Sequence, residues 1–184
     1  MSTLNMGGAF RTPPVIKSLL IINILVFMAQ ELLPFGDSIT HYGALYYWGS
    51  PNFHIWQYIT HMFLHGDVMH IFFNMFSLWM FGRILEYDLG SKRFLIFYLV
   101  AGIGAGILYN CVNWLQYQFI DPRVALMMMN VGTVGASGAI YGILLGFGML
   151  HPNSVIMLMF PPIPMKAKYF VIIFMVIELV MGLR

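Results

Sequence analysis

Charged residues are scarce in this sequence of 184 residues. Lys, Arg, Asp and Glu together make up 9% of it, whereas soluble domains carry roughly 25%. So few charges cannot cover a water-exposed surface, which argues against an ordinary soluble domain. The nine basic and seven acidic residues are also spread along the chain, so no basic cluster for nucleic acid and no acidic tail is present.

Cysteine and metal-binding patterns are equally sparse. The single cysteine, Cys111, cannot form an internal disulfide, and we interpret it as a packing residue. His61 and His65 are four residues apart, but no HExxH motif is present. The six histidines are too few for a di-iron membrane oxygenase. We therefore expect neither a metal nor a cofactor.

Long apolar runs are what the sequence has instead. Hydrophobic residues make up 60% of it, and a membrane-spanning helix needs roughly 20 mainly apolar residues. We predict an all-α, polytopic membrane helix bundle over residues 15–184, preceded by a flexible, cytoplasmic N-terminus over residues 1–14. The predicted spans are Lys17–Phe35, Val68–Leu85, Phe94–Trp114, Gly135–Leu150 and Tyr169–Leu183.

The basic residues indicate how these spans are oriented. Lys and Arg occur before the first span, between the second and third, and between the fourth and fifth. The segment Leu32–Asp67, called the outer loop below, has none, and the loop after the third span has only Arg123. The positive-inside rule then predicts a cytoplasmic N-terminus and places the outer loop on the opposite side.

The outer loop is rich in aromatic residues, which favour the membrane interface. We expect it to lie partly in the outer leaflet, with its backbone hydrogen-bonded internally in short helices. An ordinary exposed loop is the alternative. The aromatic residues are Tyr42, Tyr46, Tyr47, Trp48, Phe53, Trp56 and Tyr58.

Polar residues within the predicted spans suggest function, because they are costly in a membrane. His70 and Asn74 are four residues apart, so they share one helical face, which we expect to point into the bundle. A pair of polar packing residues is the alternative. Gly135–Gly138 (Gly-Ala-Ser-Gly) opens the fourth span one turn before Tyr141, and it contains the candidate nucleophile Ser137.

The fourth span also has a face made of small residues. Gly138, Gly142 and Gly146 recur every four residues, which lets another helix approach closely. A helix-packing motif is therefore the alternative to a catalytic one. Because Ser137 lies where a helix begins, its backbone N–H lacks a partner within that helix and favours negative charge.

Together these residues resemble the rhomboid family of intramembrane serine proteases, over roughly Leu19 to the C-terminus. One departure is visible, because Trp56-Gln57 stands where the family often has Trp-Arg, which puts the loop-bracing role of that arginine in doubt. The resemblance rests on His65 and His70, on the His70–Asn74 spacing, on Gly82 with Glu86, and on Gly135, Ser137, Gly138 and Tyr141.

The resemblance implies a serine endopeptidase that cleaves transmembrane segments of membrane proteins within the lipid bilayer. It implies Ser137 as nucleophile and His70 and Asn74 as oxyanion donors, without a cofactor. It also implies a bacterial inner membrane protein, a site open to the periplasmic side and a fifth helix that acts as a lateral gate. Supporting roles fall to Gly135, Gly138, Tyr141 and His65.

The general base is the part of the site that these residues do not supply. Rhomboid proteases use a Ser–His dyad whose histidine lies on a sixth helix. His151 follows the fourth span some 14 residues after Ser137, or roughly 21 Å along a helix, which is too far. We therefore expect an incomplete chain with five of six transmembrane helices, inactive alone, whose Gly138/Gly142/Gly146 face lacks its partner helix.

Two other functions stay open. A rhomboid-like pseudoprotease would bind membrane clients without cleaving them, which fits the missing base but not the intact Ser137, His70 and Asn74. A small transporter or channel subunit would need paired charges in the membrane, for which the sequence offers Glu178, with Glu31 near a helix end.

Overall fold

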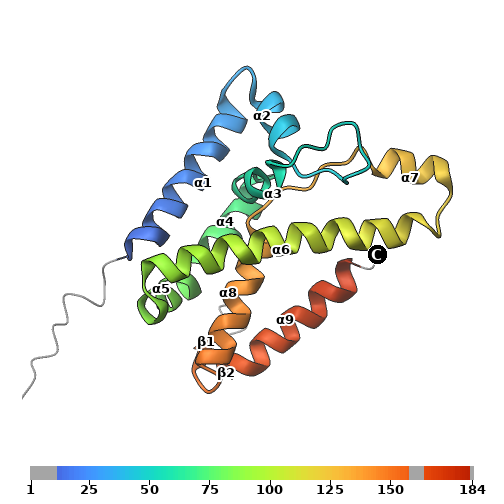
Figure 1. Cartoon of the computed structure of the whole chain (residues 1–184). Helices are drawn as coiled ribbons and strands as arrows, with labels where there is room; N and C mark the ends of the chain where they lie inside the picture. The colour runs from blue at the N-terminus through green and yellow to red at the C-terminus, as the bar shows by residue number, and fades with distance from the viewer. Residues whose placement is uncertain (1–11, 158–163, 183–184) are drawn as a thin grey trace, which may run out of the picture.

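The computed structural model describes residues 12–157 and 164–182, with the backbone alone for residues 174, 175 and 177–182, which include Glu178. The chain is mostly helical (Figure 1). Among the described residues, three helices are long and apolar enough to cross a membrane: α1 (Pro14–Leu32), the continuous helix Val68–Leu89 and α6 (Ser91–Tyr117). Two further helices, α8 (Ser137–Leu150) and α9 (Ala167–Gly182), follow at the predicted fourth and fifth spans.

The helices agree with the predicted membrane helix bundle, while the count of five crossings and the division at residue 15 stay predictions. The helix Val68–Leu89 consists of α4 (Val68–Ser77), a π-helical turn η2 (Leu78–Gly82) and α5 (Arg83–Leu89). One feature departs from an all-α chain. Strands β1 (Val155–Met157) and β2 (Pro164–Lys166) form an antiparallel hairpin before α9.

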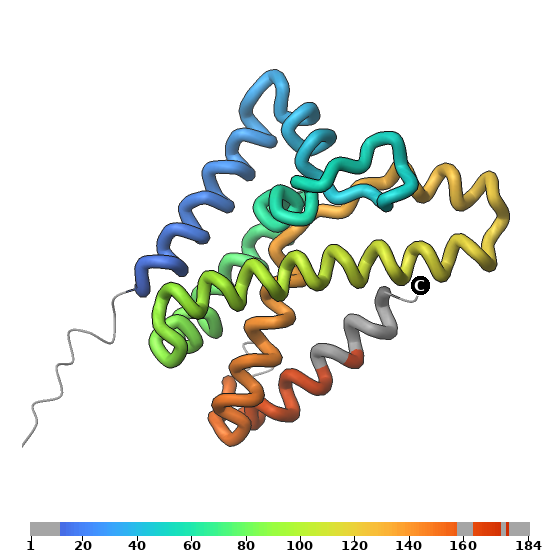
Figure 2. The backbone as a smooth tube through the Cα atoms, in the orientation of Figure 1, coloured from blue at the N-terminus to red at the C-terminus, as the bar shows by residue number. Residues whose placement is uncertain are grey.

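Short helices occupy the two loops opposite this hairpin. The outer loop contains α2 (Gly36–Gly43), α3 (Gln57–Thr60) and the 3-10 turn η1 (His61–Phe63), which confirms the predicted short helices. The loop between α6 and α8 contains α7 (Pro122–Met128). Figure 2 shows both loops at the same end of the molecule, away from the β-hairpin.

The face of small residues on α8 packs against α6. A methyl group at Gly138 would lie 2.5 Å from Ala105 Cβ, and one at Gly142 would lie 2.5 Å from Ala101 Cβ. Both glycines are therefore required by the close approach of the two helices. The expectation that this face lacks its partner helix was wrong, because α6 occupies it.

The end of α5 holds the first helix in place. Glu86 is buried, and its carboxylate accepts hydrogen bonds from Val15 N (3.0 Å), Ile16 N (2.8 Å) and the hydroxyl of Ser91 (2.6 Å). The first two are amides in the first turn of α1, which lack partners within that helix. Glu86 thus braces the turn after its own helix through Ser91 and caps the first turn of α1, and the capping of α1 was not predicted from the sequence.

Gln57 braces the outer loop where the family often has arginine. Its side chain is fully buried. The amide oxygen accepts from His54 N (3.0 Å) and Tyr46 N (3.4 Å), while the amide nitrogen donates to the carbonyls of Asn52 (2.9 Å) and Tyr42 (3.4 Å). One neutral side chain thus joins four points of the loop, and the bracing role does not depend on a positive charge.

Candidate active site

The segment before α8 is held by the outer loop. Leu45 and Thr133 exchange two backbone hydrogen bonds of 2.9 Å each, and Gly135 N donates to the carbonyl of His61 (2.9 Å). Gly135 has φ of +131°, a conformation that favours glycine. The chain then enters α8 at Ser137, so the Ser137 N–H has no partner within the helix.

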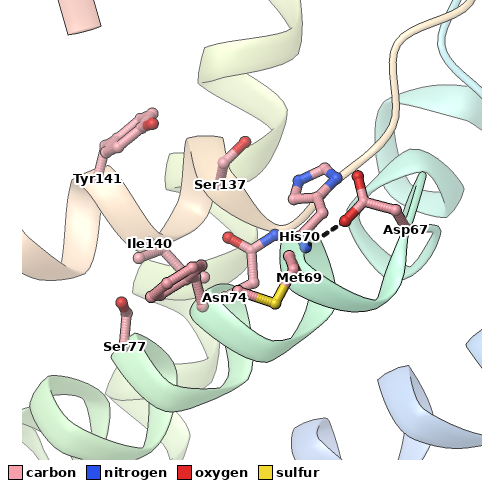
Figure 3. Close-up of a pocket in the computed structure, with 9 residues that line it drawn as sticks. Asp67, Met69, His70, Asn74, Ser77, Ser137, Ile140 and Tyr141 are labelled. Atoms are coloured by element: carbon pink, nitrogen blue, oxygen red, sulfur yellow. Dashed lines mark hydrogen bonds between the residues drawn. The ribbon is translucent and has the colours of Figure 1, made fainter.

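His70 is oriented by the start of α4. The side chain of Asp67 caps this helix by accepting from His70 N (2.8 Å), which is the bond drawn in Figure 3. Gly66 N–H donates to His70 Nδ1 at 3.4 Å. Because Nδ1 acts as an acceptor, the proton of the neutral ring is assigned to Nε2.

Nε2 of His70 and the hydroxyl of Ser137 border the same small space. A methyl group placed on Gly135 would lie 2.8 Å from His70 Nε2 and 3.4 Å from Ser137 Oγ. A side chain at Gly135 would therefore collide with the His70 ring and crowd the Ser137 hydroxyl, and both groups lie beside this backbone position. Both residues also line one cavity.

Asn74 adds a second amide donor from one helical turn further along α4. It is buried, and its Nδ2 has no hydrogen-bond partner among the described residues. Figure 3 shows Asn74 and His70 on the same side of α4, facing the start of α8. They line a cavity of about 420 Å³ together with Asp67, Met69, Phe73, Ser77, Ser137, Ile140 and Tyr141.

A second cavity, of about 260 Å³, shares Ser137 and Tyr141 with the first. His61 contributes to its wall, and His61 Nδ1 lies 2.7 Å from the carbonyl of Gln57. A carbonyl only accepts, so Nδ1 carries the proton and Nε2 is left as an acceptor. The other lining residues are Leu45, Ala105, Gly106, Tyr109, Thr133, Val134, Gly135 and Gly138.

His65 packs behind His70. It is 1% exposed, and the two rings meet edge to face with their centres 5.1 Å apart. Burial, with a further contribution from His70, lowers the pKa of His65 to about 4, against a weaker opposing effect of the Phe63 carbonyl. Burial likewise lowers the pKa of His61, while its bond to the Gln57 carbonyl acts in the opposite direction. Both rings are therefore neutral at pH 7.

His151 lies at the other end of α8, where it contacts the Asp88 carboxylate at 2.6 Å. This agrees with its predicted exclusion from the site. Within residues 12–157 and 164–182, no group of three or more His, Cys, Asp or Glu is placed to hold a metal ion.

The structure thus brings Ser137, His70, Asn74 and Tyr141 to one cavity, with Gly135 between the first two. Sequence reasoning missed the contributions of Asp67 and of Gly66. Asp67 could have been found, because an Asp three residues before His70, at the start of an apolar run, is a typical helix N-cap. The Gly66 contact depends on a loop conformation that has no comparable sequence signal.

The fold and the site together define an integral membrane protein with a serine-centred polar site between its helices. Comparison with known proteins places it further. The Rhomboid domain family matches residues 52–184, more than half of the chain. The chain therefore belongs to the rhomboid family.

Curated relatives come from bacteria, plants and yeast. Rhomboid protease GlpG of Klebsiella pneumoniae is 30% identical over 132 residues, which cover 71% of this chain and 41% of that protein. Rhomboid-like protein 11, chloroplastic, of Arabidopsis thaliana is 31% identical over 126 residues, 68% of this chain and 38% of that protein. Rhomboid protein 1, mitochondrial, of Saccharomyces cerevisiae is 35% identical over 102 residues, 55% of this chain and 27% of that protein. The chain thus spans less than half the length of each of these three relatives.

Proposed function

We propose that this chain carries the nucleophile and oxyanion donors of an intramembrane serine endopeptidase that cleaves transmembrane segments of membrane proteins. The observation that carries the proposal is that Ser137 Oγ and His70 Nε2 both lie beside Gly135 and that the two residues line one cavity. A tetrahedral intermediate needs this pairing, with a nucleophile on its carbon and a donor on its oxygen.

The donors around Ser137 match the charge that such an intermediate develops. Oγ of Ser137 would attack the scissile carbonyl, and the carbonyl oxygen would become an oxyanion. Donors for it are His70 Nε2–H, the Asn74 amide and the Ser137 backbone N–H at the start of α8. The unpaired Asn74 Nδ2 supports this role, because a buried donor without a partner is costly unless function requires it.

Water for hydrolysis would come from the second cavity. It borders Ser137, and the unprotonated Nε2 of His61 gives its wall a hydrogen-bond acceptor. A water molecule held there would be next to the acyl-enzyme that Ser137 forms. This acceptor in an otherwise mainly apolar wall would help a helix bundle in a bilayer to retain a reactant that lipid excludes.

Three of the six histidines are unsuited to act as the base of the proposed Ser–His dyad. His70 keeps its proton on Nε2 as a donor, His65 is packed behind it, and His151 is paired with Asp88 at the far end of α8. We further propose a cytoplasmic N-terminus, a site open to the periplasmic side of a bacterial inner membrane, and α9 as the lateral gate.

The test is cleavage of a transmembrane substrate in proteoliposomes by the full-length protein. Ser137→Ala should abolish cleavage, and His70→Ala and Asn74→Ala should each lower kcat by about 10²–10³-fold. Ser77→Ala is the matched control, because Ser77 is a second hydroxyl residue lining the same cavity, and it should keep nearly full activity. Cleavage that survives Ser137→Ala, or that is lost equally in Ser77→Ala, would refute the assignment.

A further inference from the structure

The loop between α6 and α8 exposes an unusual number of large apolar side chains. Within residues 118–131, called the α7 segment below, Phe119 is 87% exposed, Met127 74%, Val131 64% and Leu126 63%. Ala125 is the one buried side chain of this segment. Isolated exposed apolar residues are common, but a continuous group of this kind marks a contact surface.

The backbone of the α7 segment is hydrogen-bonded within the segment itself or to its immediate neighbours. Phe119 N donates to Gln116 O (3.0 Å), Ala125 N to Asp121 O (2.9 Å) and Val131 N to Met128 O (3.0 Å). The Asn130 amide donates to Leu126 O (3.0 Å). Backbone groups in contact with lipid must be satisfied internally, and these bonds satisfy much of the α7 segment in that way.

The charges of the α7 segment suit the membrane interface and not the hydrocarbon core. Asp121 and Arg123 are both exposed at the start of α7, and Asp121 Oδ1 caps the helix by accepting from Arg123 N (2.8 Å). One carboxylate and one guanidinium beside exposed Phe119 and Met127 give an amphipathic surface. Such a surface is satisfied where head groups and acyl chains meet.

The apolar surface of the α7 segment continues that of α6. Val112, Trp114 and Leu115 are exposed in the last turns of α6. With its 27 residues, α6 is about 40 Å long, which exceeds the thickness of a hydrocarbon layer of roughly 30 Å. Figure 1 shows α7 turning back from that end toward the outer loop. Ser50 Oγ and Asn52 Nδ2 of this loop both donate to Asn130 Oδ1, at 3.2 and 3.3 Å.

We propose that the α7 segment lies in the lipid interface, on the membrane side of the outer loop, with Phe119, Leu126, Met127 and Val131 in contact with acyl chains. This attachment fixes the C-terminal end of α6, and α8 packs against Ala101 and Ala105 in the middle of the same helix. Val131 also lies two residues before Thr133, which pairs with Leu45. The depth of Ser137 in the membrane is thereby tied to the contact of the α7 segment with lipid.

The test is the depth of spin labels in the protein reconstituted into phosphatidylcholine vesicles, and it is independent of protease activity. In a Cys111→Ala background, single cysteines replace Phe119 or Met127. Leu108, exposed on α6, gives the reference within the bilayer, and Asn153, exposed in the turn after α8, gives the reference in water. Collision rates with oxygen and with a water-soluble nickel chelate are measured, and circular dichroism checks that each variant keeps its helices.

The ratio of oxygen to nickel collisions at residues 119 and 127 should be severalfold higher than at residue 153 and lower than at residue 108. A ratio at either label equal to that at residue 153 would place the segment in water and overturn the proposal. A ratio equal to that at residue 108 would place it in the hydrocarbon core and overturn it too. Low collision rates with both reagents, with spectra that broaden as protein density rises, would indicate a second copy of the chain instead of lipid.

Discussion

The contact between Gly138 and Ala105 predicts a strong steric coupling between α8 and α6. A methyl group added at Gly138 would lie 2.5 Å from Ala105 Cβ, whereas carbon atoms in ordinary contact are about 3.5–4.0 Å apart. Gly138→Ala therefore forces the helices about 1 Å apart, and overpacking of this size costs about 1–3 kcal/mol of unfolding free energy. Ala105→Gly removes the opposing methyl group, so the double variant should recover most of that loss.

The assay is a double-mutant cycle on equilibrium unfolding in mild detergent, followed by circular dichroism. We expect a coupling energy of about 1–3 kcal/mol in favour of the double variant, because intrinsic helix propensities cancel in the cycle. Gly142 and Ala101 form a second pair with the same 2.5 Å distance, and they should behave alike. Gly104→Ala is the control, because a methyl group there meets nothing within 4 Å. A coupling energy near zero at both pairs would refute the close packing of α6 on α8.

Three further predictions concern buried polar side chains. Glu86→Gln replaces a buried carboxylate that accepts three hydrogen bonds, so it should lower the free energy of unfolding in detergent by about 1.5–3 kcal/mol. Asp88→Asn is the control, because Asp88 contacts His151 at an exposed position, and it should lower that free energy by less than about 1 kcal/mol. The pKa of His65 is lowered from 6.5 in the unfolded chain to about 4 in the folded chain, so between these pH values the unfolded chain binds one more proton. The free energy of unfolding should therefore fall by up to about 3 kcal/mol as the pH drops from 6.5 to 4. His65→Phe should flatten that part of the stability–pH curve, and an unchanged slope would contradict the assignment. Gln57→Ala leaves buried groups of the outer loop unpaired, so it should lower the free energy of unfolding by about 1–3 kcal/mol. It should also make this loop more sensitive to limited proteolysis, and an unchanged rate of proteolysis would contradict the bracing role of Gln57.

The apolar runs of the sequence were sufficient to predict where the long helices lie. The predicted span Val68–Leu85 corresponds to a helix that continues to Leu89, and the predicted span Phe94–Trp114 corresponds to α6 from Ser91 to Tyr117. The errors lie at helix ends, where charged residues such as Lys92 and Arg93 are already helical before the apolar run begins. An apolar run therefore locates a helix but does not give its ends.

Contacts between distant residues could not be predicted in the same way. The helical spacing of His70 and Asn74 predicted their common face, because that relation is local. The pairing of Glu86 with the amides of α1 joins residues about 70 positions apart, and nothing near either residue signals the other. The partner of the small-residue face on α8 was also misassigned, because a glycine repeat shows that a helix can approach but does not identify which one.

The dependence of α1 on Glu86 has a consequence for biosynthesis. The first helix leaves the ribosome before residue 86 has been made, so its first-turn amides, Val15 N and Ile16 N, have no carboxylate to bind at that stage. At a translation rate of about 5–20 residues per second, this interval lasts roughly 4–14 s. During that time α1 must remain inserted through its apolar surface alone, and its final position is fixed only once the second long helix has entered the membrane. A slow step in assembly of the nascent chain is therefore expected at the arrival of Glu86.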